Sequence, residues 1–282
     1  MAGPGIVTTV AELRARIAVW RRDGARIGLV PTMGALHEGH LSLVRTASAR
    51  ADKVIVSVFV NPAQFAPHED FDRYPRALED DTGKLTGTAA VDLVFAPQVA
   101  EMYPEGFATK IDVGGPGTGL ETDFRPHFFS GVATVVAKLL IAALPDLAMF
   151  GEKDYQQLLV VRRLVADLGL PVEIVGAAIV READGLALSS RNAYLKPDER
   201  KIAGRLNLIL KDVVARVRAG GPIADAETAG AAALREAGFA TVDYVAVRDA
   251  ATLAKIETLA RPARILAAAK VGATRLIDNM SV

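Results

Sequence analysis

The sequence predicts an α/β fold, in which a doubly wound parallel sheet is followed by a smaller α+β domain. Short apolar runs rich in β-branched residues alternate with amphipathic segments of helical period through the first two-thirds of the 282-residue chain. These runs are nearly continuous in apolar character, which is typical of strands covered on both faces. Farther along, long helical segments come first and strands follow. We therefore expect one domain over residues 1–184 and a second over 185–282.

The first domain is expected to consist of repeated strand–helix units. The second strand has the strongest β pattern, because Val, Ile and Phe dominate it. Helices of about 10 to 15 residues between the strands favour parallel pairing. The expected strands are 26–33, 53–60, 91–95, 147–150 and 172–180, with a short extra strand at 109–113, and the expected helices are 37–50, 72–85, 131–144 and 154–168.

A glycine-rich break separates two long helices in the second domain. Gly220, Gly221 and Pro222 interrupt the helical pattern between them. The expected elements are helices at 197–219 and 224–237, a strand at 242–247, a short helix at 250–258 and strands at 264–270 and 275–279. This order predicts a small α+β domain.

The composition limits the classes of function. Lys and Arg number 33, as do Asp and Glu, so the formal net charge is zero and no global field attracts nucleic acid or an anionic membrane. The absence of cysteine excludes disulfides, thiolate zinc sites and a cysteine nucleophile. The most apolar stretch, 132–144, contains Lys138 and is shorter than the roughly 20 residues that span a bilayer. We expect a cytoplasmic protein that binds neither nucleic acid nor membrane and builds any anion site locally.

Two histidines stand at the start of the first predicted helix of the strand–helix units. His37 and His40 are three residues apart and therefore share one face of the first turn, with Gly39 between them. The unpaired N–H groups of a helix N-terminus attract phosphate, and imidazoles there can donate hydrogen bonds as charge develops. Two other interpretations stay open: a structural helix cap, and a zinc-binding pair, although zinc-binding helices space their histidines four apart. The remaining histidines are His68 and His127.

Polar residues also follow two further strands. Asn61 and Gln64 can recognise hydroxyls and carboxylates without adding charge, although this segment also fits an ordinary strand exit. Lys153 is a compact cation suited to phosphate, and Asp154 can accept hydrogen bonds from a ribose. Asp154 equally fits a helix N-cap, with Gln157 three residues on.

A fourth polar segment follows the last strand of the first domain. Ser189, Ser190 and Arg191 offer two hydroxyls and a forked guanidinium to phosphate oxygens, and taken alone they form a weak loop motif. All four segments lie at the carboxyl ends of predicted parallel strands, where open sheets bind their ligands. The pattern therefore predicts one local anion site. The lack of a Gly-x-x-x-x-Gly-Lys-Ser/Thr loop, of Gly-x-Gly-x-x-Gly after the first strand and of Gly-x-Ser-x-Gly argues against P-loop, dinucleotide-binding and hydrolase chemistry.

The motifs, taken together, resemble those of the pantothenate synthetase family. His37-Glu-Gly-His40 is similar to the His-x-Gly-His signature of nucleotidyl-transfer enzymes. The wider segments 31–40, 58–65, 151–157 and 184–192 occur in the order and spacing of the family, and 275–279 resembles its C-terminal ending. The resemblance runs from about Val7 to the last residue.

The resemblance implies a fold and an activity. The fold is a Rossmann-like domain with a smaller C-terminal lid domain, in a homodimer. The activity is an ATP-dependent ligase: ATP and pantoate give pantoyl-adenylate and pyrophosphate, and β-alanine then displaces AMP to give pantothenate. Mg²⁺ is implied as well, with no protein ligand assigned to it.

Roles for individual residues follow from the same resemblance and from the chemistry above. The expected catalytic residues are His40 as proton donor, His37, Lys153 and Arg191. The residues expected to bind ATP are Met33, Gly34, Ala35, Leu36, His37, Glu38, Gly39, His40, Gly151, Glu152, Lys153, Asp154, Val180, Leu188, Ser189, Ser190 and Arg191. Pantoate is expected to bind Gln64, Gln157 and Asn61, and β-alanine to bind Gln64.

One segment departs from the family pattern. The family often has Arg-Pro-x-His-Phe-x-Gly-Val, whereas this chain has Phe128 at the histidine position and His127 before it. No role is therefore expected for Phe128. Three other functions stay open: a nucleotidyltransferase that leaves the nucleotide on its product, a non-catalytic nucleotide sensor and a metal hydrolase.

Overall fold

A computed structural model of the chain describes residues 3–66, 69 and 71–282, and its larger sheet has six strands. The order is β1-β4-β3-β2-β5-β6, and every neighbouring pair is parallel. The strands are β1 (Gly5–Val7), β2 (Ile27–Thr32), β3 (Lys53–Val58), β4 (Leu93–Phe95), β5 (Leu147–Gly151) and β6 (Glu173–Ala177). The predicted parallel sheet is confirmed.

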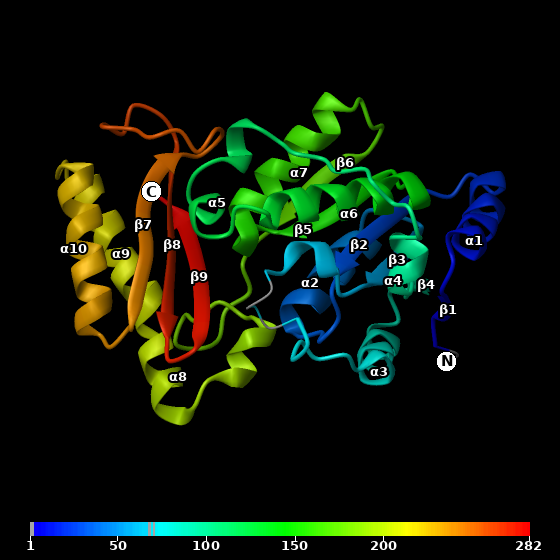
Figure 1. Cartoon of the computed structure of the whole chain (residues 1–282), viewed down its shortest axis with the longest axis horizontal. Coiled ribbons are helices and arrows are strands. Elements are labelled where there is room, and N and C mark those ends of the chain that lie inside the picture. Colours follow the sequence, from blue (N-terminus) through cyan, green and yellow to red (C-terminus); the bar gives the residue numbers. More distant parts are fainter. Residues whose placement is uncertain (1–2, 67–68, 70) are drawn as a thin grey trace.

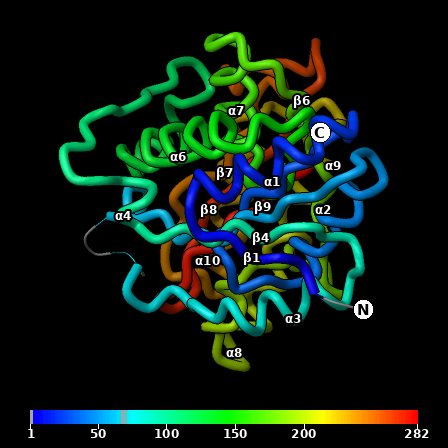
Figure 2. Tube along the Cα trace, turned by 90° about the vertical axis from the view of Figure 1, so that its right-hand side faces the viewer, coloured from blue at the N-terminus to red at the C-terminus, as the bar shows by residue number. Residues whose placement is uncertain are grey.

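Helices cover both faces of this sheet. The helices α1 (Val10–Arg22), α6 (Phe128–Ala143) and α7 (Tyr155–Asp167) pack on one face, and α2 (Glu38–Ser48) and α3 (Leu78–Thr88) pack on the other (Figure 1). Successive residues of β3 show why both faces need cover: Ile55 belongs to the first core, whereas Val54 and Val56 belong to the second. Figure 2 shows the same layers from the side, with α6 and α7 above the sheet and α3 below it. The doubly wound arrangement is confirmed.

The chain reverses its direction of travel across the sheet between β2 and β5. From β2 it proceeds to β3 and β4 on one side, and it then returns to β5 and β6 on the other side of β2. The loops that leave β2 and β5 therefore diverge from two adjacent strands. In open parallel sheets this switch point opens a crevice at the carboxyl ends of the strands.

The C-terminal part is built around a smaller antiparallel sheet, in the order β7-β8-β9. Its elements are α8 (Pro197–Ala203), α9 (Arg205–Arg218), α10 (Ile223–Glu236), β7 (Thr241–Asp249), β8 (Ala263–Val271) and β9 (Thr274–Ser281). One face packs on α9 and α10 in a core of its own. The opposite face, through Ala246 and Leu266, contacts Leu120 and Leu159 of the preceding part. The small sheet therefore lies between its own helices and the crevice side of the large sheet (Figure 1).

Short elements connect these parts. They are α4 (Val99–Met102), α5 (Glu121–Phe124), and the 3-10 turns η1 (Pro62–Gln64), η2 (Gly115–Gly117), η3 (Glu152–Asp154) and η4 (Ser190–Tyr194). Among the described residues, no helix combines the length and the apolar character needed to cross a membrane. The domain boundary at residue 184 stays a prediction.

Several predicted elements differ from the observed ones. The extra strand at 109–113 is wrong, because the backbone N–H of Ile111 bonds the Thr134 hydroxyl at 3.0 Å instead of a strand. The short helix at 250–258 is also wrong, because the Asp249 carboxylate accepts from the backbone of Ala251 and Thr252 and closes a turn. The strand expected over 172–180 ends at Ala177.

Helix boundaries account for the other differences. The helix expected at 72–85 begins only at Leu78, and the helix expected at 197–219 is interrupted at Gly204, where the Asp184 carboxylate packs against the backbone. The sequence analysis missed α1, although Thr9 and Glu12 form a capping box at its start.

Candidate active site

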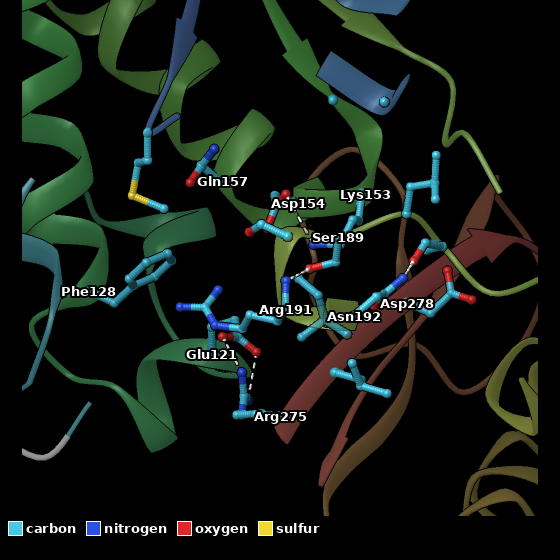
Figure 3. Close-up of a pocket in the computed structure, with 18 of the residues that line it drawn as sticks. Glu121, Phe128, Lys153, Asp154, Gln157, Ser189, Arg191, Asn192, Arg275 and Asp278 are labelled. Carbon is cyan, nitrogen blue, oxygen red and sulfur yellow. Dashed lines mark hydrogen bonds and ion pairs between the residues drawn. The ribbon is translucent and has the colours of Figure 1, made fainter. Parts of the chain in front are cut away.

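One cavity of about 1050 Å³ lies at the carboxyl ends of the parallel strands, between the large sheet and the small one. Figure 3 shows Lys153, Asp154, Gln157 and Arg191 facing the same space. The predicted site residues that line the cavity are Met33, His37, Gly39, His40, Asn61, Gln64, Gly151, Lys153, Asp154, Gln157, Val180, Leu188, Ser189, Ser190 and Arg191. Segments far apart in sequence therefore converge on one crevice, as the strand-end argument predicts.

Five residues predicted to bind ATP lie outside this lining: Gly34, Ala35, Leu36, Glu38 and Glu152. Leu36 is buried in the core beneath the sheet. Glu38 points away and pairs with Arg45 on the helix surface. Glu152 pairs with Arg264 of the small sheet, with 3.1 Å between Oε2 and NH2. The sequence places these residues next to the site but does not reveal which way each one points.

A buried carboxylate that the sequence analysis missed shapes the loop after β2. Asp81 of α3 is 1 % exposed and accepts hydrogen bonds from the backbone N–H groups of Ala35 at 2.9 Å and Leu36 at 2.7 Å. Gly34 has φ +82° at this turn, and a Cβ there would lie 2.9 Å from the Asp81 carboxylate. Glycine therefore permits the turn that delivers His37 to the helix start. The only sequence signal for Asp81 was its position, as an acidic residue, within the helix expected at 72–85.

His37 and His40 cap the N-terminus of α2 with their own rings. His37 Nδ1 accepts from the backbone N–H of Gly39 at 3.1 Å, and His40 Nδ1 accepts from the backbone N–H of His37 at 3.3 Å. The His37 ring lies so close over Gly39 that a Cβ there would lie 2.8 Å from Cε1. The interpretation as a helix cap is therefore correct for the ring nitrogens that face the backbone. Because each Nδ1 accepts a hydrogen bond, each neutral ring carries its proton on Nε2.

The surroundings of the two histidines favour their neutral forms. Burial, followed by the positive charge of Lys153, lowers the pKa of His37 from 6.5 to about 4. Burial, followed by the neighbouring His37 and by Lys153, lowers the pKa of His40 from 6.5 to about 3. The ring centroids are 4.1 Å apart, so two imidazolium charges would repel each other strongly. Near neutral pH both rings are therefore uncharged hydrogen-bond donors.

Lys153 and Asp154 occupy the turn between β5 and α7. Lys153 Nζ lies 3.6 Å from Asp154 Oδ2, and both side chains line the cavity. The expected N-cap role of Asp154 is wrong, because its side chain makes no capping hydrogen bond to α7. Its carboxylate is turned toward the cavity instead, next to the ammonium group of Lys153.

The amide groups after β3 form a buried network. Asn61 is 1 % exposed, and its Nδ2 donates to Gln64 Oε1 and to the Gly131 carbonyl, both at 3.1 Å. Asn61 Oδ1 accepts from the Tyr103 hydroxyl at 2.6 Å. Gln64 Nε2 in turn contacts Met33 Sδ at 3.0 Å. Asn61 therefore fixes the orientation of Gln64, and Gln64 presents its amide at the cavity wall.

Phe128, the residue that departs from the family pattern, stacks on a guanidinium. The Arg125 Cζ lies 3.8 Å from the centroid of the Phe128 ring. Arg125 also pairs with Glu69 at 2.6 Å and donates to the Gln64 carbonyl at 3.2 Å. Phe128 thereby supports the residue that holds the backbone of Gln64. The ring atom Nε2 of His127 is buried and has no hydrogen-bond partner among the described residues.

Ser189, Ser190 and Arg191 follow β6 in the chain and line the same cavity. Ser189 Oγ accepts from the backbone N–H of Arg191 at 3.3 Å and starts the turn η4. The hydroxyls of Ser190 and Tyr74 lie 3.2 Å apart. These two contacts hold the start of the turn, and the Arg191 side chain lines the cavity.

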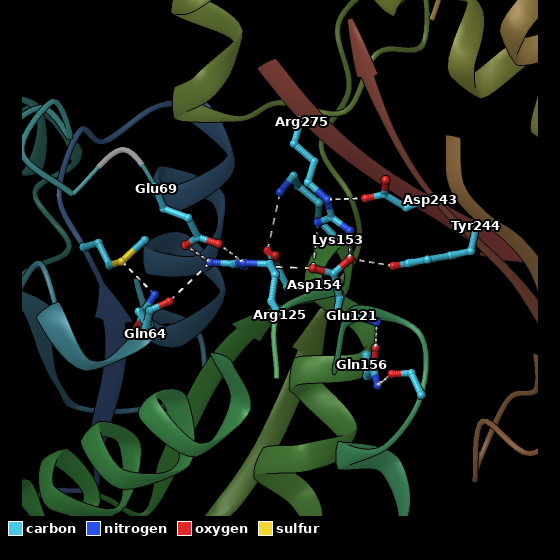
Figure 4. A network of polar contacts seen from close by, with 12 residues as sticks. Gln64, Glu69, Glu121, Arg125, Lys153, Asp154, Gln156, Asp243, Tyr244 and Arg275 are labelled. Carbon is cyan, nitrogen blue, oxygen red and sulfur yellow. Dashed lines mark hydrogen bonds and ion pairs between the residues drawn. The ribbon is translucent and has the colours of Figure 1, made fainter. Parts of the chain in front are cut away.

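A charged cluster in the cavity lining joins the small sheet to α5 (Figure 4). The buried carboxylate of Glu121 accepts two hydrogen bonds from Arg275 of β9 and one from the Tyr244 hydroxyl of β7, each at 2.7 Å. Arg275 also pairs with Asp243 at 2.7 Å. Burial and the negative charge of Glu121 raise the pKa of Tyr244 well above its usual value. This cluster fixes the small sheet against α5 and was not foreseen from the sequence.

The cavity lining contains side chains of the types that bind metals, but they are not grouped as a metal centre in the described part of the chain. Within residues 3–66, 69 and 71–282, no group of three His, Cys, Asp or Glu side chains is placed to hold a metal ion. His68 lies outside the described residues. Asp154 offers the cavity an oxygen ligand of the kind that Mg²⁺ prefers.

Known proteins resemble this chain over its whole length. The family model of the pantoate–β-alanine ligases matches residues 5–281. A pantothenate synthetase of Mesorhizobium japonicum is 57% identical over 282 residues, which are 100% of this chain and 99% of that protein. The crystal structure of pantothenate synthetase from Thermus thermophilus superposes with a TM-score of 0.91 at 51% identity and covers 98% of both chains.

A second solved structure carries ligands. It is the pantoate–β-alanine ligase from Francisella tularensis complexed with β,γ-ATP and β-alanine, which superposes with a TM-score of 0.81 at 32% identity and covers 99% of this chain and 97% of that one. The resemblance seen in the motifs is thereby confirmed. The chain belongs to the pantoate–β-alanine ligase family.

Proposed function

We propose that this protein uses ATP to condense pantoate with β-alanine through a pantoyl-adenylate, giving pantothenate, AMP and pyrophosphate. One observation carries the proposal: His40, Lys153 and Arg191, from three separate segments, line a single cavity at the switch point of the parallel sheet. A site for a triphosphate needs converging donors of this kind in a protein with no net charge. The family membership adds the identities of the acid and the amine.

The first step joins the pantoate carboxylate to the α-phosphorus of ATP. The new C–O–P linkage forms as the bond to pyrophosphate breaks, and negative charge gathers on the phosphate oxygens. Lys153 and Arg191 stabilise that charge electrostatically. His37 and His40 donate hydrogen bonds from Nε2 toward the phosphate oxygens, and His40 is the proton donor in this proposal.

The remaining predicted residues hold the substrates. Gln64 and Gln157 bind the hydroxyls and carboxylate of pantoate, and Asn61 keeps Gln64 in place. Mg²⁺, when bound with ATP, would neutralise phosphate charge, and the Asp154 carboxylate in the cavity lining would help to hold it. The other residues assigned to ATP from the sequence form the walls and the support of the same crevice.

The second step transfers the pantoyl group to β-alanine. The neutral amine attacks the acyl carbon, the C–O bond to AMP breaks, and the amine loses a proton. Holding the two reactants together contributes up to about 7–11 kcal/mol when they are well oriented. The segment 185–282 acts as the lid that keeps water from the adenylate. The protein works as a cytoplasmic homodimer in this proposal.

The test is AMP release from the purified protein with ATP, Mg²⁺, pantoate and β-alanine, with each component omitted in turn. Pyrophosphate should require ATP and pantoate, and AMP with an amide product should require β-alanine as well. A nucleotide conjugate as the final product, seen by mass spectrometry, would identify a nucleotidyltransferase instead. ATP binding without any pyrophosphate would identify a sensor, and chelator-sensitive hydrolysis without ATP a metal hydrolase.

A further inference from the structure

We propose that Asn279 is a positioning residue for Lys153, which it holds in place from the C-terminal sheet. The inference rests on the proposed function, because it concerns the cation that faces the phosphates of ATP. Asn279 lies on β9, and Lys153 lies in the turn after β5, 126 residues earlier. The small sheet then helps to position a catalytic residue, in addition to covering the cavity.

The amide of Asn279 is bound through both its nitrogen and its oxygen. Its Nδ2 donates to the main-chain carbonyls of Glu152 at 2.9 Å and Lys153 at 2.8 Å. Its Oδ1 accepts from Arg264 Nε at 2.6 Å, which fixes the orientation of the amide group. Asn279 is 1 % exposed, so water does not compete for these bonds. The side chain therefore acts as a bridge between two sheets.

Arg264 strengthens the same bridge from β8. Its NH2 pairs with Glu152 Oε2 at 3.1 Å, and its Cζ lies 3.9 Å from the centroid of the Tyr155 ring. Arg264 and Asn279 share one face of the small sheet because Leu266, two residues from Arg264, pairs with Asn279. The residues on both sides of Lys153 are thereby held by the C-terminal sheet.

The turn that carries Lys153 receives little support from its own elements. Among the described residues, no side chain caps η3, and none caps the start of α7. The two carbonyls that Asn279 binds lie in η3, a single 3-10 turn before α7 whose helical hydrogen bonds are few and of poorer geometry than those of an α-helix. The position of Lys153 therefore depends on Asn279. Movement of a catalytic group by about 1 Å can lower a rate about 10²-fold.

The experiment compares variants in pantoate-dependent exchange of labelled pyrophosphate into ATP. Asn279→Asp keeps the acceptor for Arg264 and the size of the side chain but removes the donor to the two carbonyls. We expect it to lower the exchange kcat about 10²-fold, while the KM for pantoate changes less than about threefold. In a Lys153→Ala background the same substitution should lower the rate less than about threefold, because the group that it positions is gone.

Asn207→Ala is the matched control. Asn207 has the same 1 % exposure, lies in the same domain and donates to Asp278, but it does not contact the turn at 152–154. Asn207→Ala should lower the thermal midpoint without a Lys153-dependent loss of kcat. If Asn279→Asp fails to fold, Asn279→Ser replaces it, because a serine hydroxyl is too short to reach both carbonyls.

Two results would overturn the inference: a wild-type kcat in the folded Asn279 variant, or an equal loss with and without Lys153. If turnover of Lys153→Ala is below detection, affinity for the β,γ-imido analogue of ATP is measured by calorimetry instead, because binding needs no turnover. The wild type, Asn279→Asp, Lys153→Ala and the double variant are then compared. If Asn279→Asp weakens this affinity equally with and without Lys153, the inference is contradicted. Failure of the wild-type protein to exchange pyrophosphate would instead contradict the proposed function, so the two failures are distinguishable.

Discussion

The large parallel sheet and the small antiparallel sheet both contribute polar groups to the cavity, but they place them differently. In the parallel sheet the strands are apolar, and polar residues begin where strands end, as His37 does beyond β2 and Lys153 beyond β5. In the small sheet, Arg275, Asp278 and Asn279 line the cavity from within a strand. The first sheet supplies the groups that meet the substrates, and the second holds some of those groups in place.

Substitution of Lys153, the cation that follows β5, should have the largest effect on kcat. Lys153→Ala removes a positive charge from the site where phosphate charge develops, so we expect kcat to fall about 10²- to 10³-fold. Far-ultraviolet circular dichroism should stay unchanged, because the Lys153 side chain makes no buried structural contact beyond Asp154 in the described residues.

The control for this variant is Lys201→Ala. Lys201 is an exposed lysine that pairs with Asp198 on the surface of α8, outside the cavity. Its substitution should leave kcat within about twofold of the wild-type value. Near-normal turnover of Lys153→Ala would contradict the role of Lys153 in stabilising phosphate charge.

Substitution within the small sheet should act first on stability. Arg275→Ala leaves the Glu121 carboxylate buried without its main partner, and breaking a buried ion pair in this way typically costs about 3 kcal/mol. Arg163→Ala, which breaks an exposed pair with Asp167, should cost less than about 1 kcal/mol. Urea denaturation measures both values. Equal values for the two variants would show that the charged cluster does not hold the small sheet against α5.

The same contrast explains how much the sequence predicts. A parallel sheet gathers all its carboxyl ends on one edge, so a correct strand pattern is enough to bring His40, Lys153 and Arg191 together. The alternation of β9 does not reveal whether its polar face meets solvent or another sheet, so the bond from Asn279 to Lys153 could not be predicted. Asp81 was missed for a similar reason, because its partners are backbone groups that carry no sequence signal.

Protonation of His37 and His40 should make the free energy of unfolding depend on pH. Both pKa values lie below the usual 6.5, so the unfolded chain binds more protons than the folded one between pH 6.5 and about 4. The free energy of unfolding should therefore fall as the pH drops through that window. His37→Asn keeps a capping oxygen but does not titrate, so its stability should fall less steeply. Parallel profiles for the two proteins would contradict the low pKa values.

The smallest expected effect concerns the residue that departs from the family pattern. Phe128→Ala removes the ring beneath Arg125, a contact worth about 1 kcal/mol, so the KM for pantoate should rise about fivefold through Gln64. Phe128→His keeps a flat ring at this position, so its KM for pantoate should stay within about twofold of the wild-type value. An unchanged KM in Phe128→Ala would show that Arg125 holds Gln64 without this support.

A crystal structure of the protein with pantoate and the β,γ-imido analogue of ATP would examine both sheets at once. We expect Lys153 Nζ, the Arg191 guanidinium and His40 Nε2 within hydrogen-bond distance of the phosphates, while Asn279 Nδ2 still binds the carbonyls of Glu152 and Lys153. A nucleotide bound outside this cavity, or a Lys153 that contacts phosphate only after Asn279 has released its turn, would contradict this description of the molecule.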